Sequence, residues 1–255
     1  MNHEAVAAEA AAPGALCVAV LGAESTGKTT LASSLAVALA QIGELAGPAG
    51  PAHAAARSGM RTAWVPEVLR KWCDDHGRTP QAHEQAAILQ AQHAHIDAAA
   101  RQHDVVVCDT TGLMTAVYSE LIFGDCSLHL LAVGLHRRMA ISLLTALDLP
   151  WVPDGYQRDG PQVREPVDHA IRALLVQHRL PFAVIGGSGP ARLQQALAAL
   201  RPLLRQRAAP HASGASGASG LFTRLQKDVV AASAWACECC GDAPYERALR
   251  RQALS

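Results

Sequence analysis

Short apolar runs that alternate with segments of helical spacing are the main pattern along this chain. The run LCVAVLG, residues 16–22, is apolar and ends in glycine, as a buried parallel strand does. TAWVPE, DVVVCDT, LLTALDLP and FAVIGG, at residues 62–67, 104–110, 143–150 and 182–187, are similar runs. Helical spacing fills the intervals, for example at residues 34–43 and 80–102. The pattern predicts an α/β fold in which helices sandwich a five-stranded parallel sheet.

Composition changes mark the expected domain boundaries. Residues 1–14 are rich in alanine and are expected to be a disordered lead-in, and residues 15–207 carry the periodic pattern of one domain. ASGASGASG belongs to an expected flexible linker at 208–220, which a cysteine-containing tail follows at 221–255. Residues 45–59, rich in Gly, Pro and Ala, are interpreted as an irregular surface insertion.

The overall charge excludes some classes of partner. The formal net charge is zero, so no global basic field attracts nucleic acid. Apolar stretches stop well short of the roughly 20 residues that a bilayer-spanning helix needs. We therefore expect neither nucleic acid nor membrane as a partner, and a cytoplasmic protein. The seven cysteines are an odd number, which suits reduced thiols better than a disulfide framework.

A phosphate-binding loop follows the first predicted strand. GAESTGKT, residues 22–29, matches G-x-x-x-x-G-K-[ST] and lies between a predicted strand and a predicted helix. Lys28 is expected to reach the β- and γ-phosphates of ATP or GTP, and the Thr29 hydroxyl to bind Mg²⁺. The alternative is a glycine-containing turn with a surface lysine. The predicted ATP-binding residues are Gly22, Ala23, Glu24, Ser25, Thr26, Gly27, Lys28, Thr29 and Thr30, although Thr30 could serve the helix alone.

An aspartate at the end of the third strand is the second candidate. Asp109 directly follows VVVC, where ligands bind in open α/β sheets. It could hold Mg²⁺ or accept the proton of an attacking hydroxyl. The structural alternative is a cap on the next helix, a role that Thr110 or Thr111 would fill equally well.

The second strand leads into a candidate substrate side. Glu67 and Arg70 follow it, and could hold ribose hydroxyls, act as base or neutralise phosphate charge. The alternative is an exposed ion pair that stabilises the fold by less than ~1 kcal/mol. Trp72 is interpreted as a core residue rather than a platform for a base.

Residues 151–164, WVPDGYQRDGPQVR, form a polar segment that could close over a nucleotide. Arg158 and Arg164 would then stabilise charge on the transferred phosphoryl group. An ordinary solvated loop is the alternative for each arginine.

The remaining metal-binding side chains point to no zinc site. His93 and His95 lie two residues apart on a predicted helix and face different directions. Cys237, Cys239 and Cys240 lie close together in the tail without a downstream pair of ligands. Two protomers could pool these ligands, so a protein partner or self-association through the tail stays open.

Together these segments resemble the ribosylnicotinamide kinase domain of NadR-type proteins, a P-loop kinase of NAD salvage. The resemblance covers roughly residues 16–200 and rests on LGAESTGKTTL, WVPEVLRKW, HIDAAARQHDVVVCDTTGLMTAVYSELIFG and WVPDGYQRDGPQVR. It implies a fold similar to nucleoside monophosphate kinases and ATP-dependent phosphorylation of the 5′-hydroxyl of nicotinamide riboside.

The resemblance also implies roles for individual residues. Lys28, Thr29 and Asp109 would serve ATP and Mg²⁺, Glu67 and Arg70 would face the nucleoside, and Arg158 would belong to the lid. Two departures limit the transfer. Only residues 1–15 precede the first strand, so the adenylyltransferase and DNA-binding parts of multifunctional members are expected to be absent, and the QRDG spacing shifts the lid arginine.

The predicted mechanism is in-line attack of the substrate hydroxyl on the γ-phosphate, with Lys28 and Mg²⁺ neutralising charge and Asp109 or Glu67 taking the proton. Two other functions stay open: a regulatory ATPase or nucleotide switch that acts on a protein partner, and a kinase of another nucleoside or nucleotide.

Overall fold

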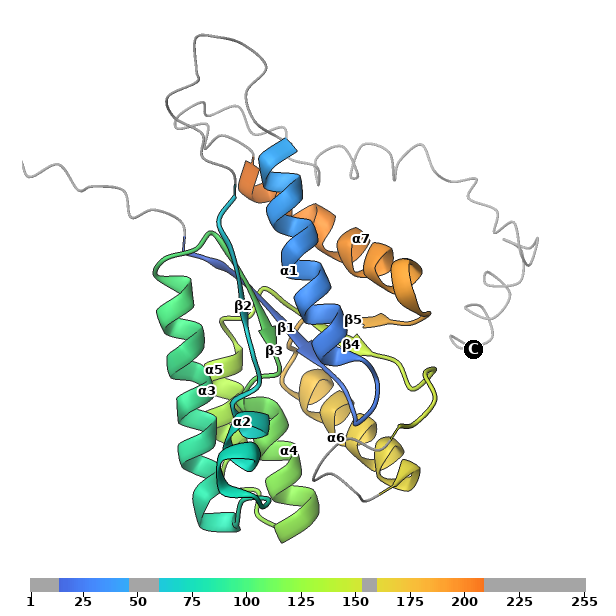
Figure 1. Cartoon of the computed structure of the whole chain (residues 1–255). Helices are drawn as coiled ribbons and strands as arrows, with labels where there is room; N and C mark the ends of the chain where they lie inside the picture. The colour runs from blue at the N-terminus through green and yellow to red at the C-terminus, as the bar shows by residue number, and fades with distance from the viewer. Residues whose placement is uncertain (1–13, 46–59, 153–159, 209–255) are drawn as a thin grey trace, which may run out of the picture. The chain divides into compact units, whose positions relative to one another are not determined.

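The computed structural model of the chain describes residues 14–45, 60–152 and 160–208 (Figure 1). The predicted lead-in before Gly14, the linker and the cysteine-containing tail lie outside the described residues, and so does nearly all of the predicted insertion. These boundaries stay predictions.

Five parallel strands form one sheet, as predicted. They are β1 (Leu16–Leu21), β2 (Thr62–Val65), β3 (Val105–Asp109), β4 (Ile141–Thr145) and β5 (Phe182–Ile185), in the order β2-β3-β1-β4-β5. β1 lies in the middle between β3 and β4, and Val20 pairs with Asp109. The register therefore places the end of β3 beside the loop that leaves β1.

One strand begins and ends earlier than its sequence pattern predicted. β4 runs from Ile141 to Thr145, whereas the prediction was residues 143–150. It can include the polar Ser142 because the Ser142 hydroxyl lies 2.7 Å from His136 Nε2 in the protein interior. It ends at Thr145, which pairs with the last residue of β5, and the apolar residues beyond it leave the sheet.

Seven α-helices connect and cover the strands within the described residues. After each of two 3₁₀ turns, Ala82–Glu84 and Pro161–Val163, an α-helix follows directly. The α-helices are α1 (Lys28–Leu45), α2 (Val68–His76), α3 (Gln85–Ala100), α4 (Gly112–Phe123), α5 (His129–His136), α6 (Arg164–Gln177) and α7 (Gly189–Ala208).

The two faces of the sheet bury alternate residues of the same strands. In β1, Cys17, Ala19 and Leu21 pack in the cluster that holds α3, α4, α5 and α6 side chains. Val18 and Val20 point the other way and pack against α1 and α7. Figure 1 shows these two helical layers on either side of the sheet. This period of two is what a strand covered on both faces requires.

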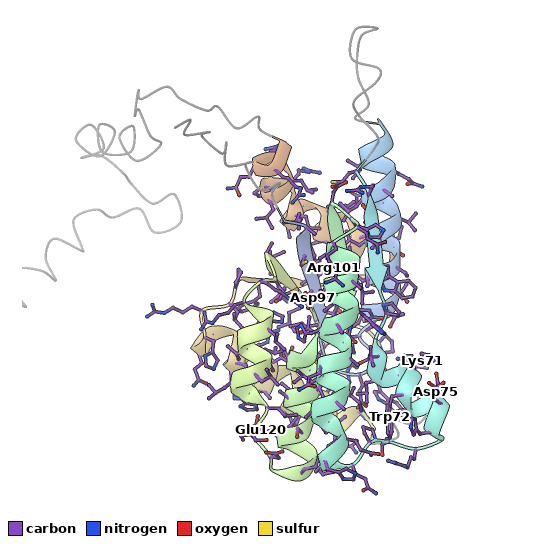
Figure 2. The ribbon with its side chains drawn as sticks, turned by 90° about the vertical axis from the view of Figure 1, so that its left-hand side faces the viewer. Lys71, Trp72, Asp75, Asp97, Arg101 and Glu120 are labelled. Carbon is purple, nitrogen blue, oxygen red and sulfur yellow. The ribbon has the colours of Figure 1, made fainter. Side chains whose placement is uncertain are left out.

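α2 lies at the edge of the fold, and none of its residues is fully buried. Trp72 stacks on His76 with ring centroids 3.9 Å apart and planes 8° apart, and the Arg78 guanidinium lies 4.8 Å from the Trp72 ring. The interpretation of Trp72 as a core residue is therefore wrong: it packs within α2 and the turn that follows, beside Lys71 and Asp75 on the same helix (Figure 2).

Among the helices that the structure describes, none combines the length and the apolar character needed to cross a membrane.

The packing of α1 against the sheet leads to a first prediction. Leu35 is fully buried in the cluster that joins α1 and α7 to the sheet. Leu35→Ala should lower the free energy of unfolding by about 2–5 kcal/mol, because it leaves a cavity. Val37, two residues further along the same helix, is 59% exposed, so Val37→Ala should change stability by less than about 0.5 kcal/mol. Urea unfolding curves measure both, and equal effects would contradict this account of the core.

Candidate nucleotide-binding site

The glycine that opens the loop sits where no side chain fits. Gly22 has φ +151°, and a Cβ built on it would lie 2.0 Å from Thr145 Oγ1 and 3.0 Å from Thr26 Oγ1. The two threonine hydroxyls lie 2.6 Å apart, and Thr145 Oγ1 is also 3.0 Å from the Leu21 carbonyl oxygen. The end of β4 therefore locks the start of the loop against β1.

The loop curls so that it opens onto a cavity of about 620 Å³. Ser25 and Gly27 adopt left-handed conformations with φ +53° and +74°, which turn the backbone into a concave anion-binding shape. The Ser25 hydroxyl donates a hydrogen bond of 2.5 Å to the Val152 carbonyl. The cavity is lined by Ser25, Thr26, Gly27, Lys28, Thr29, Thr30, Arg70, Leu149, Pro150 and Val152.

Lys28 lies across this loop. Its ammonium donates a hydrogen bond of 2.8 Å to the Ala23 carbonyl. Burial lowers the pKa of Lys28 below its ordinary value, and the carboxylates of Glu67, Asp109 and Glu24 oppose that shift. The alternative of a surface lysine on an ordinary turn is therefore wrong, because Lys28 is held among the carboxylates of Glu24 in its own loop and of Glu67 and Asp109 from two other segments.

Asp109 is a buried carboxylate, only 1% exposed, that faces the loop from the end of β3. It accepts a hydrogen bond from the Thr29 side chain, while its Oδ1 has no hydrogen-bond partner among the described residues. Burial raises the pKa of Asp109, against the opposing effects of the Thr29 hydrogen bond and the Lys28 and Arg70 charges. A buried carboxylate oxygen beside a threonine hydroxyl suits a hard divalent cation, so these residues fit Mg²⁺.

Asp109 does not cap the next helix. Thr111 is the N-cap of α4, and its side chain accepts a hydrogen bond from Leu113 N. Thr110, between the two, has φ +68°, a strained conformation for a β-branched residue. Strain of this kind is often found at functional sites, where the surrounding structure enforces it.

A buried polar chain behind Asp109 holds this turn. The Thr111 hydroxyl lies 2.9 Å from His136 Nδ1, and His136 Nε2 lies 2.7 Å from the Ser142 hydroxyl. Burial, with a smaller effect of His93, lowers the pKa of His136 to about 4. The neutral imidazole therefore ties the start of α4 to β4.

Glu67 and Arg70 lie where β2 ends and α2 begins. Glu67 is the N-cap residue of α2 but makes no side-chain capping bond, and its side chain is 11% exposed. Arg70 Nε lies 3.9 Å from Glu67 Oε2, and Arg70 lines the loop cavity. Glu67 is thus largely buried, whereas the Arg70 side chain is 45% exposed. The structure brings both residues to the loop, and their roles toward a substrate stay predictions.

The two predicted lid arginines have different outcomes. Arg158 lies outside the described residues. Arg164 is the first residue of α6 and is only 8% exposed, so it is not a solvated loop residue. Its Nη1 donates a hydrogen bond of 2.9 Å to the carbonyl of Leu149, a residue of the loop cavity, while Nε and Nη2 have no partner within the described residues. Arg164 thus holds the backbone of Leu149 in the cavity wall through this hydrogen bond.

Sequence reasoning missed the residues that follow β4 and β5. Arg192 is 4% exposed, and its Nη1 donates hydrogen bonds of 2.9 Å to Asp148 Oδ1 and 2.5 Å to the Gly187 carbonyl. Thr145, Leu149 and Val152 also contact or line the loop. The prediction of one strand over residues 143–150 hid Thr145 and Leu149 inside it. The Asp148 in that run was the available signal that the strand ends earlier.

The family model described as an AAA domain matches residues 17–192. The chain belongs to this AAA domain family. No curated protein matches the chain in sequence.

Solved NadR structures have the same fold as this AAA domain chain. A NadR protein in complex with NAD and AMP-PNP aligns with a TM-score of 0.55 at 18% identity, over 74% of this chain and 49% of its own. A NadR protein in complex with NR aligns with a TM-score of 0.57 at 18% identity, over 74% and 50%. This chain spans about half the length of those chains. The predicted P-loop fold and the resemblance to NadR-type proteins are confirmed.

The contact between Gly22 and Thr145 leads to a second prediction. Gly22→Ala should weaken ATP binding at least tenfold and lower stability, because the new methyl overlaps the Thr145 hydroxyl and the backbone conformation disfavours a side chain. Gly134→Ala in α5 is the matched control: its Cβ meets nothing within 4 Å, so it should leave binding unchanged. Titration of both variants with a fluorescent ATP analogue measures this, and tight binding by Gly22→Ala would contradict the proposed loop geometry.

The buried histidines lead to a third prediction. The pKa values of His93 and His136 are lowered to about 4, below the ordinary 6.5. The unfolded chain therefore takes up protons first as the pH falls, so stability is full above pH 6.5 and is lost toward pH 4. Each proton contributes a slope of at most about 1.4 kcal/mol per pH unit.

Urea unfolding between pH 7 and pH 5 measures this slope. His136→Gln should reduce the slope, whereas His95→Gln, which changes an exposed residue of α3, should not. A slope that His136→Gln leaves unchanged would show that His136 does not titrate as described.

Proposed function

We propose that this chain is an ATP-dependent kinase that phosphorylates the 5′-hydroxyl of nicotinamide riboside and forms nicotinamide mononucleotide in NAD salvage. One observation carries the proposal: the phosphate-binding Lys28 and Thr29 share one charged cluster with Asp109 and with Glu67 and Arg70. A site that only bound a nucleotide would need the first three residues. The charged pair at the end of β2 adds a second side to the cavity, where an acceptor can lie. The resemblance to the NadR-type kinase domain supports this choice of acceptor.

The loop residues bind and orient the nucleotide in this proposal. The amides of the concave loop and the positive end of the α1 dipole face the phosphates. The Lys28 ammonium neutralises charge on the β- and γ-phosphates. Because phosphoryl transfer requires little covalent chemistry from the protein, positioning and electrostatics supply the rate.

Thr29 and Asp109 would hold Mg²⁺. The ion, when bound, supplies positive charge to the phosphate oxygens. Asp109 could bind the ion through its buried Oδ1, because this oxygen has no other partner among the described residues. Arg70 adds a further positive charge on the acceptor side of the cavity.

In the transfer itself, the acceptor oxygen forms a bond to the γ-phosphorus while the bond from that phosphorus to the ADP oxygen breaks. The hydroxyl proton goes to Glu67 or Asp109. Burial raises the pKa of Asp109, which makes it a better proton acceptor than an ordinary aspartate. Arg164 and Arg158 complete the site in this proposal, Arg164 by supporting Leu149 and Arg158 from the lid.

The fourth prediction tests this activity directly. The purified chain, supplied with ATP, Mg²⁺ and nicotinamide riboside, should form nicotinamide mononucleotide. Lys28→Ala should abolish turnover, because it removes the charge that neutralises the β- and γ-phosphates, while the protein stays folded. Asp109→Asn should lower kcat by at least about 100-fold. Lys71→Ala is the matched control, since Lys71 pairs with Asp75 on the surface of α2.

The assay follows the mononucleotide by chromatography and ADP in parallel. Activity that persists in Lys28→Ala would show that the nucleotide site is wrongly assigned. ATP binding without mononucleotide would contradict the choice of acceptor, and other nucleosides should then be tried. Slow hydrolysis that responds only to a protein partner would favour a regulatory ATPase.

A further inference from the structure

A second cavity lies between α4, α5 and α6 and shares no lining residue with the loop cavity. Its volume is about 780 Å³. Glu120 at the end of α4, Cys126 in the connection to α5 and His129 at the start of α5 line one side. α6 lines the other side with residues that include Glu165 and His169. Figure 2 labels Glu120 on α4.

Three side chains of metal-binding type meet in this cavity. One ligand atom each of Glu120, Cys126 and His129 lies within 4.8 Å of the other two. His129 Nε2 lies 3.2 Å from Glu120 Oε2. Even so, Nε2 is buried and has no hydrogen-bond partner among the described residues. His129 Nε2 thus lies near a carboxylate and the exposed Cys126 thiol without a hydrogen bond to either, and a cation bound between the three groups would give it a partner.

The connection between α4 and α5 holds these residues in place. Gly124 N donates a hydrogen bond of 2.8 Å to the Glu120 carbonyl and ends α4. Asp125 Oδ1 accepts a hydrogen bond of 2.8 Å from Ser127 N, and His129 N donates one of 3.1 Å to the Cys126 carbonyl. The short loop is therefore hydrogen-bonded along its length, so little conformational entropy is lost when its side chains bind an ion.

The chemistry of the ligand set favours zinc over magnesium. A thiolate and an imidazole are soft or borderline ligands that suit Zn²⁺, whereas Mg²⁺ takes oxygen ligands. A thiolate and a carboxylate carry two negative charges, which balance one divalent ion. Three protein ligands leave one tetrahedral position open toward the cavity, where water can enter.

We propose that Glu120, Cys126 and His129 form a binding site for a divalent transition-metal ion of the zinc class. The ion joins the end of α4 to the start of α5 and keeps one position open to the cavity beside α6. On binding, the Cys126 thiol releases its proton to solvent and the sulfur bonds to the metal. The site is independent of the nucleotide cavity and of the proposed kinase activity.

The fifth prediction tests this site with Co²⁺, which replaces Zn²⁺ and absorbs visible light when bound by a thiolate. The tail cysteines could also bind Co²⁺, so the full chain carries Cys237→Ser, Cys239→Ser and Cys240→Ser as background. That chain, freed of metal, should bind one equivalent of Co²⁺ with a thiolate-to-metal absorption band, and Zn²⁺ should displace it.

Cys126→Ser should remove the absorption band, because the thiolate is lost. His129→Gln should weaken Co²⁺ binding at least tenfold, since loss of a group that only supports a metal ligand already costs about 10–100-fold in affinity. Cys73→Ser is the matched control, since Cys73 is a half-buried thiol on α2, outside the cluster. Binding of an ATP analogue, unchanged in all variants, shows that each is folded. An undiminished band in Cys126→Ser, or no Co²⁺ binding by the folded background chain, would overturn the proposal.

Discussion

The hydrogen-bonded contact between β1 and β4 at the start of the loop is the constraint on which the site depends. Thr145, the last residue of β4, places its hydroxyl 2.6 Å from Thr26 and 3.0 Å from the Leu21 carbonyl. That position is available only because Gly22 has no side chain there. The central strand, its neighbour and the loop are thus joined by one small polar group. Because the contact is fully buried, it is not weakened by exchange with water.

The site gathers charged side chains from several segments at the carboxyl ends of the strands. Lys28, Asp109 and Glu67 come from three different segments. Burial lowers the pKa of Lys28 and raises the pKa of Asp109, so it favours the neutral form of each group. Each charged group is stabilised mainly by the others, which is costly for a fold but useful for binding a triphosphate and a cation. The polar chain of Thr111, His136 and Ser142 keeps the end of β3 in register with this cluster. Thr110, whose backbone conformation is strained, lies between this polar chain and the charged cluster, and both hold it in place.

The sequence pattern of a segment predicted its structure correctly where the pattern was typical of a single kind of element. The apolar run before Gly22 predicted a buried strand, and the loop consensus predicted that a loop and then a helix follow it, as β1 and α1 confirm. The prediction failed where local patterns were ambiguous. Leu143 to Pro150 is apolar enough for a strand, but the pairing of β4 with β1 ends at Leu144 and its pairing with β5 ends at Thr145. Trp72 was apolar enough for a core, but α2 lies at the edge of the fold and leaves no residue fully buried.

By itself, the sequence determined the fold class and the positions of the glycine-rich loop after β1 and of Asp109 at the end of β3, because strand periodicity and turn chemistry are properties of neighbouring residues. Only the tertiary structure decided which distant groups meet. It brought Glu67 and Arg70 to Lys28, buried Arg164 with a hydrogen bond to the Leu149 carbonyl, and placed Glu120 beside Cys126 and His129. The physical reason is that these contacts depend on the order of the strands and on the packing of helices across the sheet. Long-range packing of this kind leaves no pattern among residues that are close together in the chain.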